Sequence, residues 1–125
     1  MSEDAPNQAP HLHHSIDYLE LPVSDMDEAQ RFYATAFGWE FNQYGPGYAG
    51  IKKPGGEAGG LRLEEQVTRG GPLLVLFSED LEQSLAGVRA GGGEIVVEPF
   101  DFPGGRRFHF LDPCGNELAV WALPD

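Results

Sequence analysis

A chain of 125 residues, 41% of them hydrophobic and 11% aromatic, is long enough to form one domain around its own core. Its net charge of −12 disfavours phosphate backbones, which are bound by clustered Lys and Arg, so nucleic acid is not an expected partner. A single cysteine cannot form an intramolecular disulfide, and no stretch resembles a secretory signal or a membrane span, so we expect a cytoplasmic protein without membrane contact.

The first residues are polar and contain prolines, which predicts a mobile tail over residues 1–12 and a single domain over 13–125. Three histidines, His11, His13 and His14, lie where this tail meets the domain. They resemble a metal cluster by composition, but at such a position we expect only adventitious metal binding.

The first half of the domain is predicted to begin with a strand over 16–23, where apolar and polar residues alternate. A helix follows with Ser24 as its expected N-cap, carboxylates in its first turn and a stop at Gly38. Three short extended segments come next, at 39–44, 48–52 and 60–64.

The second half repeats this order after a polar, Gly-containing connection. A strand is predicted over 73–77, followed by a helix that Ser78 or Asp80 can cap and that the three glycines 91–93 stop. Three strands are then expected, at 94–99, 107–111 and 118–121.

A shift of 55 positions superimposes the two halves, since it aligns Asp25 with Asp80 and Gly38 with Gly93. Each half alone would leave an unfinished sheet that the other half can complete. We therefore predict an α+β fold of two tandem βαβββ modules, over residues 14–65 and 72–123, whose mixed sheets curl around a cleft.

Three segments carry a family resemblance: Leu21-Pro-Val-Ser-Asp25, Arg31-Phe-Tyr33 with Phe37-Gly-Trp39, and Phe110-Leu-Asp-Pro-Cys-Gly-Asn116. The chain resembles the vicinal oxygen chelate superfamily of glyoxalases, bleomycin-resistance proteins and dioxygenases. This resemblance implies paired modules around a cleft, small oxygen-rich ligands and a cleft commonly completed across a homodimer. A homodimer also fits the strand edges and apolar cleft walls that one chain would expose.

The resemblance also implies metal ligands at four positions in those members that use a metal. Three of these positions fall on Tyr18, Leu73 and Ala119, and the fourth lies near 61–64, where Glu64 could fill it. Leucine and alanine offer a metal no donor. We therefore expect no metal and no other cofactor.

Side-chain alternation along the strands predicts which residues face the cleft. Glu20 and His109 are the expected proton-handling pair, one from the first strand and one from the penultimate strand. The expected ligand contacts are Tyr18, Leu73, Phe77, Arg107, Ala119 and Trp121. The alternatives are that Glu20 points into solvent, that His109 is a hydrogen-bonded core residue and that Trp121 only packs.

The sequence is compatible with three functions. The leading hypothesis is a metal-free protein that binds a small organic molecule in an apolar cleft, as a sequestering protein or as an enzyme of unidentified reaction. The alternative is a metal-dependent glyoxalase-like lyase or dioxygenase. The third is a structural or regulatory dimer module whose cleft is filled by its own side chains.

Overall fold

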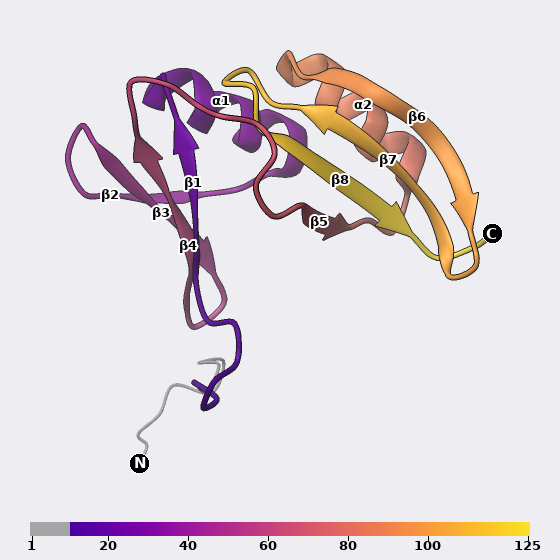
Figure 1. Ribbon diagram of the computed structural model, residues 1–125, viewed down its shortest axis with the longest axis horizontal. Coiled ribbons are helices and arrows are strands. Elements are labelled where there is room, and N and C mark those ends of the chain that lie inside the picture. Colours follow the sequence, from indigo (N-terminus) through magenta and orange to yellow (C-terminus); the bar gives the residue numbers. More distant parts are fainter. Residues whose placement is uncertain (1–10) are drawn as a thin grey trace.

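The fold consists of two units with the same order of elements, seen in a computed structural model that describes residues 11–125 (Figure 1). The tail expected over 1–12 lies almost wholly outside the described residues. The first unit contains β1 (Leu19–Val23), α1 (Met26–Phe37), β2 (Phe41–Gln43), β3 (Tyr48–Lys53) and β4 (Gly56–Leu63). The second contains β5 (Leu74–Phe77), α2 (Leu81–Gly91), β6 (Glu94–Phe102), β7 (Gly105–Leu111) and β8 (Glu117–Ala122).

Each unit forms one four-stranded mixed sheet. The strand order is β1-β4-β3-β2 in the first, here called sheet A, and β5-β8-β7-β6 in the second, sheet B. The first strand of each unit pairs in parallel with the last, and the other neighbours are antiparallel. The tandem βαβββ fold predicted from the internal repeat is therefore confirmed.

The two helices begin in the same way because an aspartate caps each. Asp25 and Asp80 have nearly equal extended backbone angles, and their carboxylates accept hydrogen bonds from the amides of Glu28 and Gln83. Ser24 is not the cap, so that expectation was one residue early. Gly38 ends α1 in the left-handed conformation, at φ 74°, as its position after the apolar stripe predicts.

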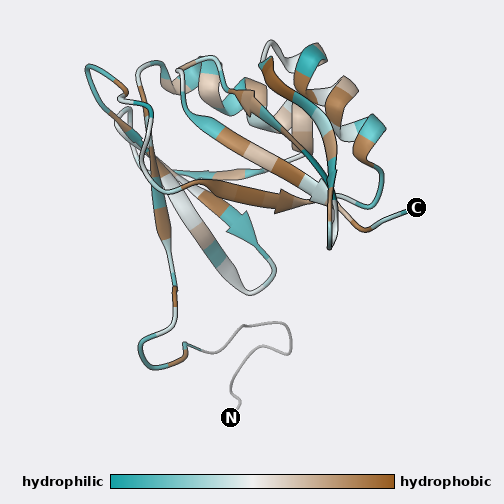
Figure 2. Ribbon diagram, turned by 45° about the vertical axis from the view of Figure 1, so that its right-hand side comes forward, coloured by the Kyte–Doolittle hydropathy of each residue, from teal (hydrophilic) through white to brown (hydrophobic). Residues whose placement is uncertain are grey.

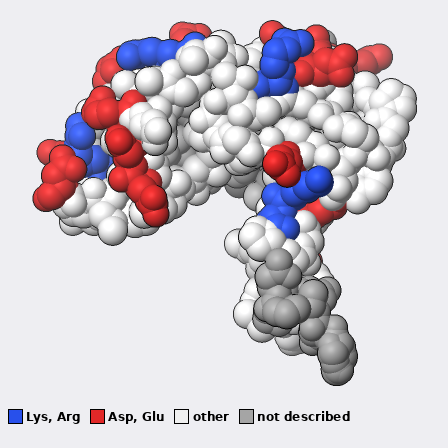
Figure 3. All heavy atoms as spheres, turned by 180° about the vertical axis from the view of Figure 1, so that it is seen from behind, with Lys and Arg blue, Asp and Glu red and all other residues white. Residues whose placement is uncertain are grey.

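One hydrophobic core joins the two units. The helices pack against each other on the same side of the sheets, and Phe32 of α1 lies 5.9 Å from Phe110 of β7 between ring centroids. Gly87 of α2 permits this approach, since a Cβ there would lie 2.8 Å from the backbone oxygen of Ala36 in α1. Figure 3 views the molecule from behind and shows most carboxylates along its outer parts, with a broad surface between them that is largely uncharged.

The sheet faces that point away from the helices differ in character. On sheet B, Val75 and Phe77 of the edge strand β5 are 44% and 55% exposed, and Figure 2 shows β5 as hydrophobic along its length. The corresponding face of sheet A carries tyrosines and glutamates. No helix within residues 11–125 has the length and apolar character needed to cross a membrane.

Candidate functional site

The open face of sheet B is built by strict alternation along β7 and β8. Phe108 and Phe110 are fully buried under the helices, which turns Arg107 and His109 to the other side of the sheet. Trp121 lies opposite Arg107 on β8. We call this surface the aromatic face and define it by six residues: Phe77, Phe100, Phe102, Arg107, His109 and Trp121.

Strand β6 contributes Phe100 and Phe102 through an irregularity. Val97 pairs with His109 and Phe100 pairs with Arg107, so β6 uses three positions where β7 uses two. This extra residue is a β-bulge, which changes the side to which the following residues point. Without it, Phe100 would lie on the face opposite to Val97.

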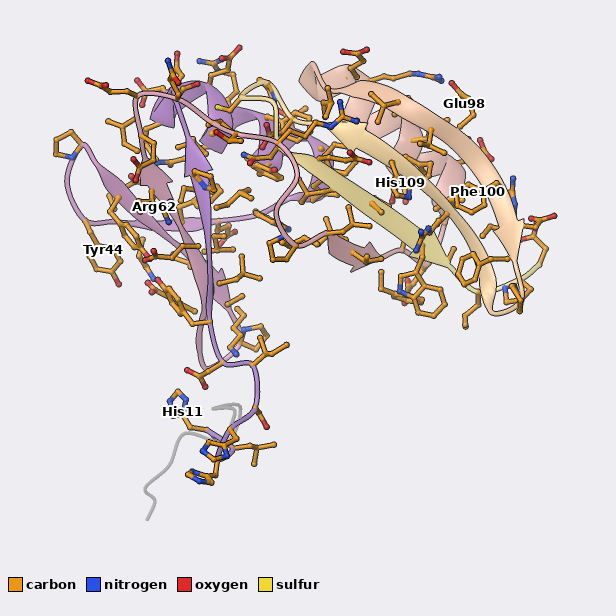
Figure 4. The ribbon with its side chains drawn as sticks, in the orientation of Figure 1. His11, Tyr44, Arg62, Glu98, Phe100 and His109 are labelled. Carbon is orange, nitrogen blue, oxygen red and sulfur yellow. The ribbon has the colours of Figure 1, made fainter. Side chains whose placement is uncertain are left out.

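Ring contacts make the aromatic face continuous. Phe77 packs edge-to-face on Trp121, with centroids 5.2 Å apart, and Trp121 lies 6.4 Å from Phe102. The guanidinium of Arg107 lies over the rings of Phe100 and Phe102, and Phe100 stacks beside His109 at 6.2 Å. Figure 4 shows His109 and Phe100 on these neighbouring strands.

His109 is held in place by a carboxylate. Its Nδ1 lies 2.9 Å from an oxygen of Glu117, whose other oxygen accepts from Arg69 in the connection between the units. These hydrogen bonds, first from His109 and then from Arg69, lower the pKa of Glu117. Glu117 therefore orients the imidazole and ties the connecting segment to sheet B.

The open face of sheet A carries a hydrogen-bond network that we call the tyrosine network. The hydroxyls of Tyr18 and Tyr48 lie 2.6 Å apart, and the Tyr48 hydroxyl donates to Glu20 at 2.9 Å. Arg62 donates to Glu20 at 3.2 Å and to Glu64 at 2.6 Å. Burial, followed by the bonds to Tyr18 and Glu20, raises the pKa of Tyr48.

Glycines make room for this network. A Cβ at Gly60 would overlap the hydroxyl of Tyr48, and one at Gly50 would overlap the carboxylate of Glu57. Glu57 in turn accepts hydrogen bonds from Tyr44 and Asn42, and these bonds, first that from Tyr44 and then that from Asn42, lower its pKa. The polar side chains of sheet A therefore lie across its strands and bond one another.

A cavity of about 450 Å³ lies between the two units. It is lined by the first strand of sheet A, the connection 68–72 and the starts of β5 and β8. Glu20 lines it from sheet A, and Leu73 and Glu117 line it from the second unit. The cavity thus places residues of both open faces around one space.

The predicted site residues fall into three groups. Phe77, Arg107, His109 and Trp121 come together on the aromatic face, Tyr18 and Glu20 belong to the tyrosine network, and Leu73 lines the cavity. Ala119 has the expected orientation but is fully buried, so its side chain is not accessible to a ligand.

Glu20 and His109 do not contact each other. Each has its own polar partners on its own sheet, and Glu20 lies among Tyr48 and Arg62 rather than among apolar walls. Tyr48, Arg62 and Arg69, as well as Phe100 and Phe102, are site residues that the sequence pattern does not single out. The bulge in β6 hides the two phenylalanines from a pattern of strict alternation.

The residues at the family's metal positions do not fit a divalent cation. Leu73 and Ala119 supply no donor, the Tyr18 hydroxyl is engaged by Tyr48, and Glu64 pairs with Arg62. Within residues 11–125, no group of three or more His, Cys, Asp and Glu side chains converges.

The sequence motifs that carry the family resemblance have a structural use here. The buried Tyr33 hydroxyl donates to Asp112 at 2.7 Å, and Asp112 also accepts from the backbone amides of Cys114 and Asn116. The Asn116 side chain donates to the backbone oxygen of Pro22 at 2.7 Å. The turn between β7 and β8 is thereby bonded to α1 and β1 of the other unit.

Comparison with known sequences agrees with this architecture. The family model of the Glyoxalase/Bleomycin resistance protein/Dioxygenase superfamily matches residues 15–120. A glyoxylase-like domain-containing protein from Didymella fabae is 28% identical, over 90% of this chain and 97% of that protein. The putative glyoxylase CFP32 of Mycobacterium bovis is 23% identical over 93% of this chain, which spans only 48% of that relative's length.

Solved structures show the same fold. A glyoxalase-related enzyme from Fulvimarina pelagi superimposes with a TM-score of 0.74 at 20% identity, covering 87% of this chain and 88% of that chain. TnmS3, an antibiotic binding protein from Streptomyces sp. CB03234, superimposes with a TM-score of 0.65 at 25% identity, covering 90% and 99% of the two chains.

Proposed function

Because the chain belongs to the Glyoxalase/Bleomycin resistance protein/Dioxygenase superfamily, we propose that it binds a small organic molecule on the aromatic face and in the adjoining cavity. The proposal includes a metal-free site and a homodimer in the cytoplasm. It rests above all on one observation, the continuous aromatic surface that sheet B exposes beside His109 and Arg107.

Exposure of this surface is what favours binding. Contiguous apolar patches on a soluble domain often mark interaction sites, and ligand sites combine apolar walls with a few polar groups that orient the ligand. Phe77 and Trp121 supply the walls, and His109, fixed by Glu117, supplies an oriented polar group. TnmS3, which has the same fold, is an antibiotic binding protein, and this supports a binding role.

A ligand screen tests the binding function. Thermal shift measurements with aldehydes, glutathione adducts, aromatic diols, aromatic acids and antibiotics exploit the rise in stability that a native-state ligand produces. We expect a response confined to one chemical class. No response to any class, with a crystal structure in which side chains of the protein itself fill the cavity, would favour a structural module instead.

Metal analysis tests the metal-free site. Protein purified without a His-tag or a metal column is expected to contain no stoichiometric metal, because the family's metal positions lack converging donors. Stoichiometric Ni, Zn, Fe or Mn would contradict this and favour a metal-dependent lyase or dioxygenase.

The Glu20→Gln variant tests the opposite wall of the cavity. Glu20 is 42% exposed in its side chain, so its bonds with Tyr48 and Arg62 contribute little stability, and we expect a nearly unchanged melting temperature. The affinity for a screened ligand that donates a hydrogen bond to the Glu20 carboxylate is expected to fall. Unchanged affinity, measured by calorimetry, would remove Glu20 from the site and leave the aromatic face alone.

A further inference from the structure

Arg107 and the exposed Arg31 of α1 are the two arginines for which the described residues show no carboxylate partner, and of these two Arg107 is the one with a buried Nε. Within residues 11–125, Arg107 lacks such a partner although the chain holds 20 Asp and Glu against 8 Lys and Arg. Arginines at four other positions pair with carboxylates, namely Arg62, Arg69, Arg89 and Arg106. In so acidic a protein, an unpaired guanidinium on the open face of a sheet suggests a partner from outside the chain.

The neighbouring arginine provides the contrast. Arg106 points to the other side of β7, where it bonds Asp101 at 3.0 Å and lies 3.8 Å from Glu82 of α2. Arg107 faces the aromatic side, where Glu117, four positions along β8 from Trp121, the register partner of Arg107, is already bonded to Arg69 and His109. Arg106 therefore has acidic partners on its side of β7, whereas the Glu117 carboxylate on the other side is bonded to residues other than Arg107.

The guanidinium of Arg107 is also held in a defined position. It lies 5.5 Å from the ring centre of Phe100 and 5.8 Å from that of Phe102, distances at which a cation is attracted to an aromatic ring. Its Nε is buried and has no hydrogen-bond partner among the described residues. A planar, ordered guanidinium with open donors matches an oxyanion, which it can bind through two parallel hydrogen bonds.

Flat surfaces lie directly beside this group. Trp121 is opposite Arg107 in the register of β7 and β8, and Phe77 packs against Trp121. Phe77 is more than half exposed, so a planar ring can pack on this pair with offset or edge-to-face geometry.

We infer that the ligand of the aromatic face is a planar aromatic acid, whose ring packs on Trp121 and Phe77 and whose oxyanion accepts hydrogen bonds from Arg107. This inference rests on the proposed function, because it names the ligand class of the same site. Arg107 selects for the acid, and the two aromatic residues supply the apolar contact.

Two naphthalene probes separate these contributions. Naphthalene-2-carboxylate and naphthalene-2-methanol share the ring system and differ in charge. Calorimetry with the wild-type protein is expected to give an affinity for the carboxylate at least about tenfold higher, the effect of one charge-assisted hydrogen-bonded pair. This comparison needs no variant, so it does not depend on the folding of an altered chain.

Variants then test whether Arg107 causes the preference for the carboxylate over the alcohol. Arg107→Gln is expected to remove the preference for the carboxylate while changing the affinity for the alcohol less than about twofold. Arg106→Gln, which removes the neighbouring charge on the opposite side of β7, is the matched control and should keep the preference. Trp121→Leu should weaken both probes alike. Circular dichroism and melting curves verify that each variant is folded.

Three results would overturn the inference. Equal affinities of the wild-type protein for both probes would refute the acid preference while leaving small-molecule binding intact. A preference that survives in Arg107→Gln would refute the role of Arg107. If neither probe binds, the ligand class is wrong, and the proposed function is then judged separately by the ligand screen, in which another class can still respond.

Discussion

Tyr33 makes a buried hydrogen bond that joins the two units. Its side chain is fully buried, and its hydroxyl donates to Asp112 of the β7–β8 turn. Replacing Tyr33 by Phe keeps the ring and its stacking on Trp39, but removes one donor from a buried carboxylate. We expect a loss of about 1–3 kcal/mol in the free energy of unfolding, measured by urea denaturation.

An exposed tyrosine serves as the control. Tyr44 also donates to a carboxylate, that of Glu57 at 2.6 Å, but its side chain is largely exposed. Tyr44→Phe should therefore cost less than about 1 kcal/mol, because water can replace the lost donor. Equal losses of unfolding free energy in the two variants would contradict the view that burial makes the Tyr33 hydrogen bond more stabilising than the Tyr44 bond.

Glu117 makes stability depend on pH in the acid range. Hydrogen bonds from His109 and Arg69 lower the pKa of Glu117 below 4.5, its ordinary value, so the folded state favours the carboxylate. The resulting stability is present above about pH 4.5 and is lost as the pH falls through the lowered pKa of the folded state.

The Glu117→Gln variant tests this dependence. We expect it to be less stable than the wild-type protein near neutral pH and the difference to shrink as the pH falls toward 3, as followed by melting temperatures across that range. Glu65→Gln, at an exposed residue of the connection, should keep the wild-type profile. A difference that stays constant with pH would show that the Glu117 contacts do not depend on its charge.

For single residues, the sequence predicts well which face of a sheet a side chain points to, because this depends on alternation along the strand. Arg107, His109 and Trp121 share one face because successive side chains of a strand point to opposite sides. Glu20 and His109 bond to partners on their own sheets, which alternation along a strand cannot predict, because it does not say which strands of two separate sheets face each other. The bond of His109 to Glu117 follows from the tight turn at 112–116, which sets the register of β7 and β8.

Among the elements, α1 and α2 form the most extensive packing contact between the two units. Gly87 lies inside α2, where an alanine would normally raise helix stability by about 1 kcal/mol. A Cβ there would meet the backbone oxygen of Ala36 at 2.8 Å, and backbone cannot move aside as easily as a side chain. Gly87→Ala is therefore expected to destabilise the protein by about 1–3 kcal/mol.

Thermal and urea denaturation of Gly87→Ala measure this loss. Ala86→Gly is the control, since Ala86 is exposed on the same helix and its replacement should cost only the helix propensity of about 1 kcal/mol. A stabilised Gly87→Ala protein would mean that the two helices separate at little cost.

Element boundaries follow from signals of different strength. The glycine at the end of α1 and the aspartate caps are local and could be predicted to within a residue. Strand β6 continues to Phe102, beyond the expected end at Pro99, because its bulges let it follow β7 further. A bulge depends on the partner strand, so one strand's own pattern cannot reveal it.

For the whole molecule, the internal repeat predicts the fold. A single module has no partner that buries its helix, and the second module supplies this partner. The relative placement of the modules depends on the α1–α2 contact and on the bonds of Asp112 and Asn116 across the units. These contacts join residues far apart in the chain, so the sequence predicts a cleft but not which residues line it.

The homodimer is a prediction for the whole molecule, and the edge of sheet B is its reason. Among residues 11–125, strand β5 has a neighbour on one side only, and Val75 and Phe77 on it are substantially exposed. Natural proteins rarely leave an apolar edge strand uncovered, because it can pair with another chain. A homodimer joined along the free backbone edge of β5 would cover that edge and leave the aromatic face, including Phe77, open to a ligand.

Sedimentation velocity at micromolar concentration should give twice the chain mass of 13.6 kDa. Val75→Lys places a charge on the exposed edge strand and is expected to shift the protein to the monomer, whereas Ala90→Lys, at an exposed position of α2, should leave the dimer unchanged. A wild-type monomer at that concentration would contradict the prediction, and a dimer that tolerates Val75→Lys would move the interface away from β5. Whether the dimer is joined at β5 or away from it, the aromatic face stays open in each subunit, and each dimer should bind two ligands independently.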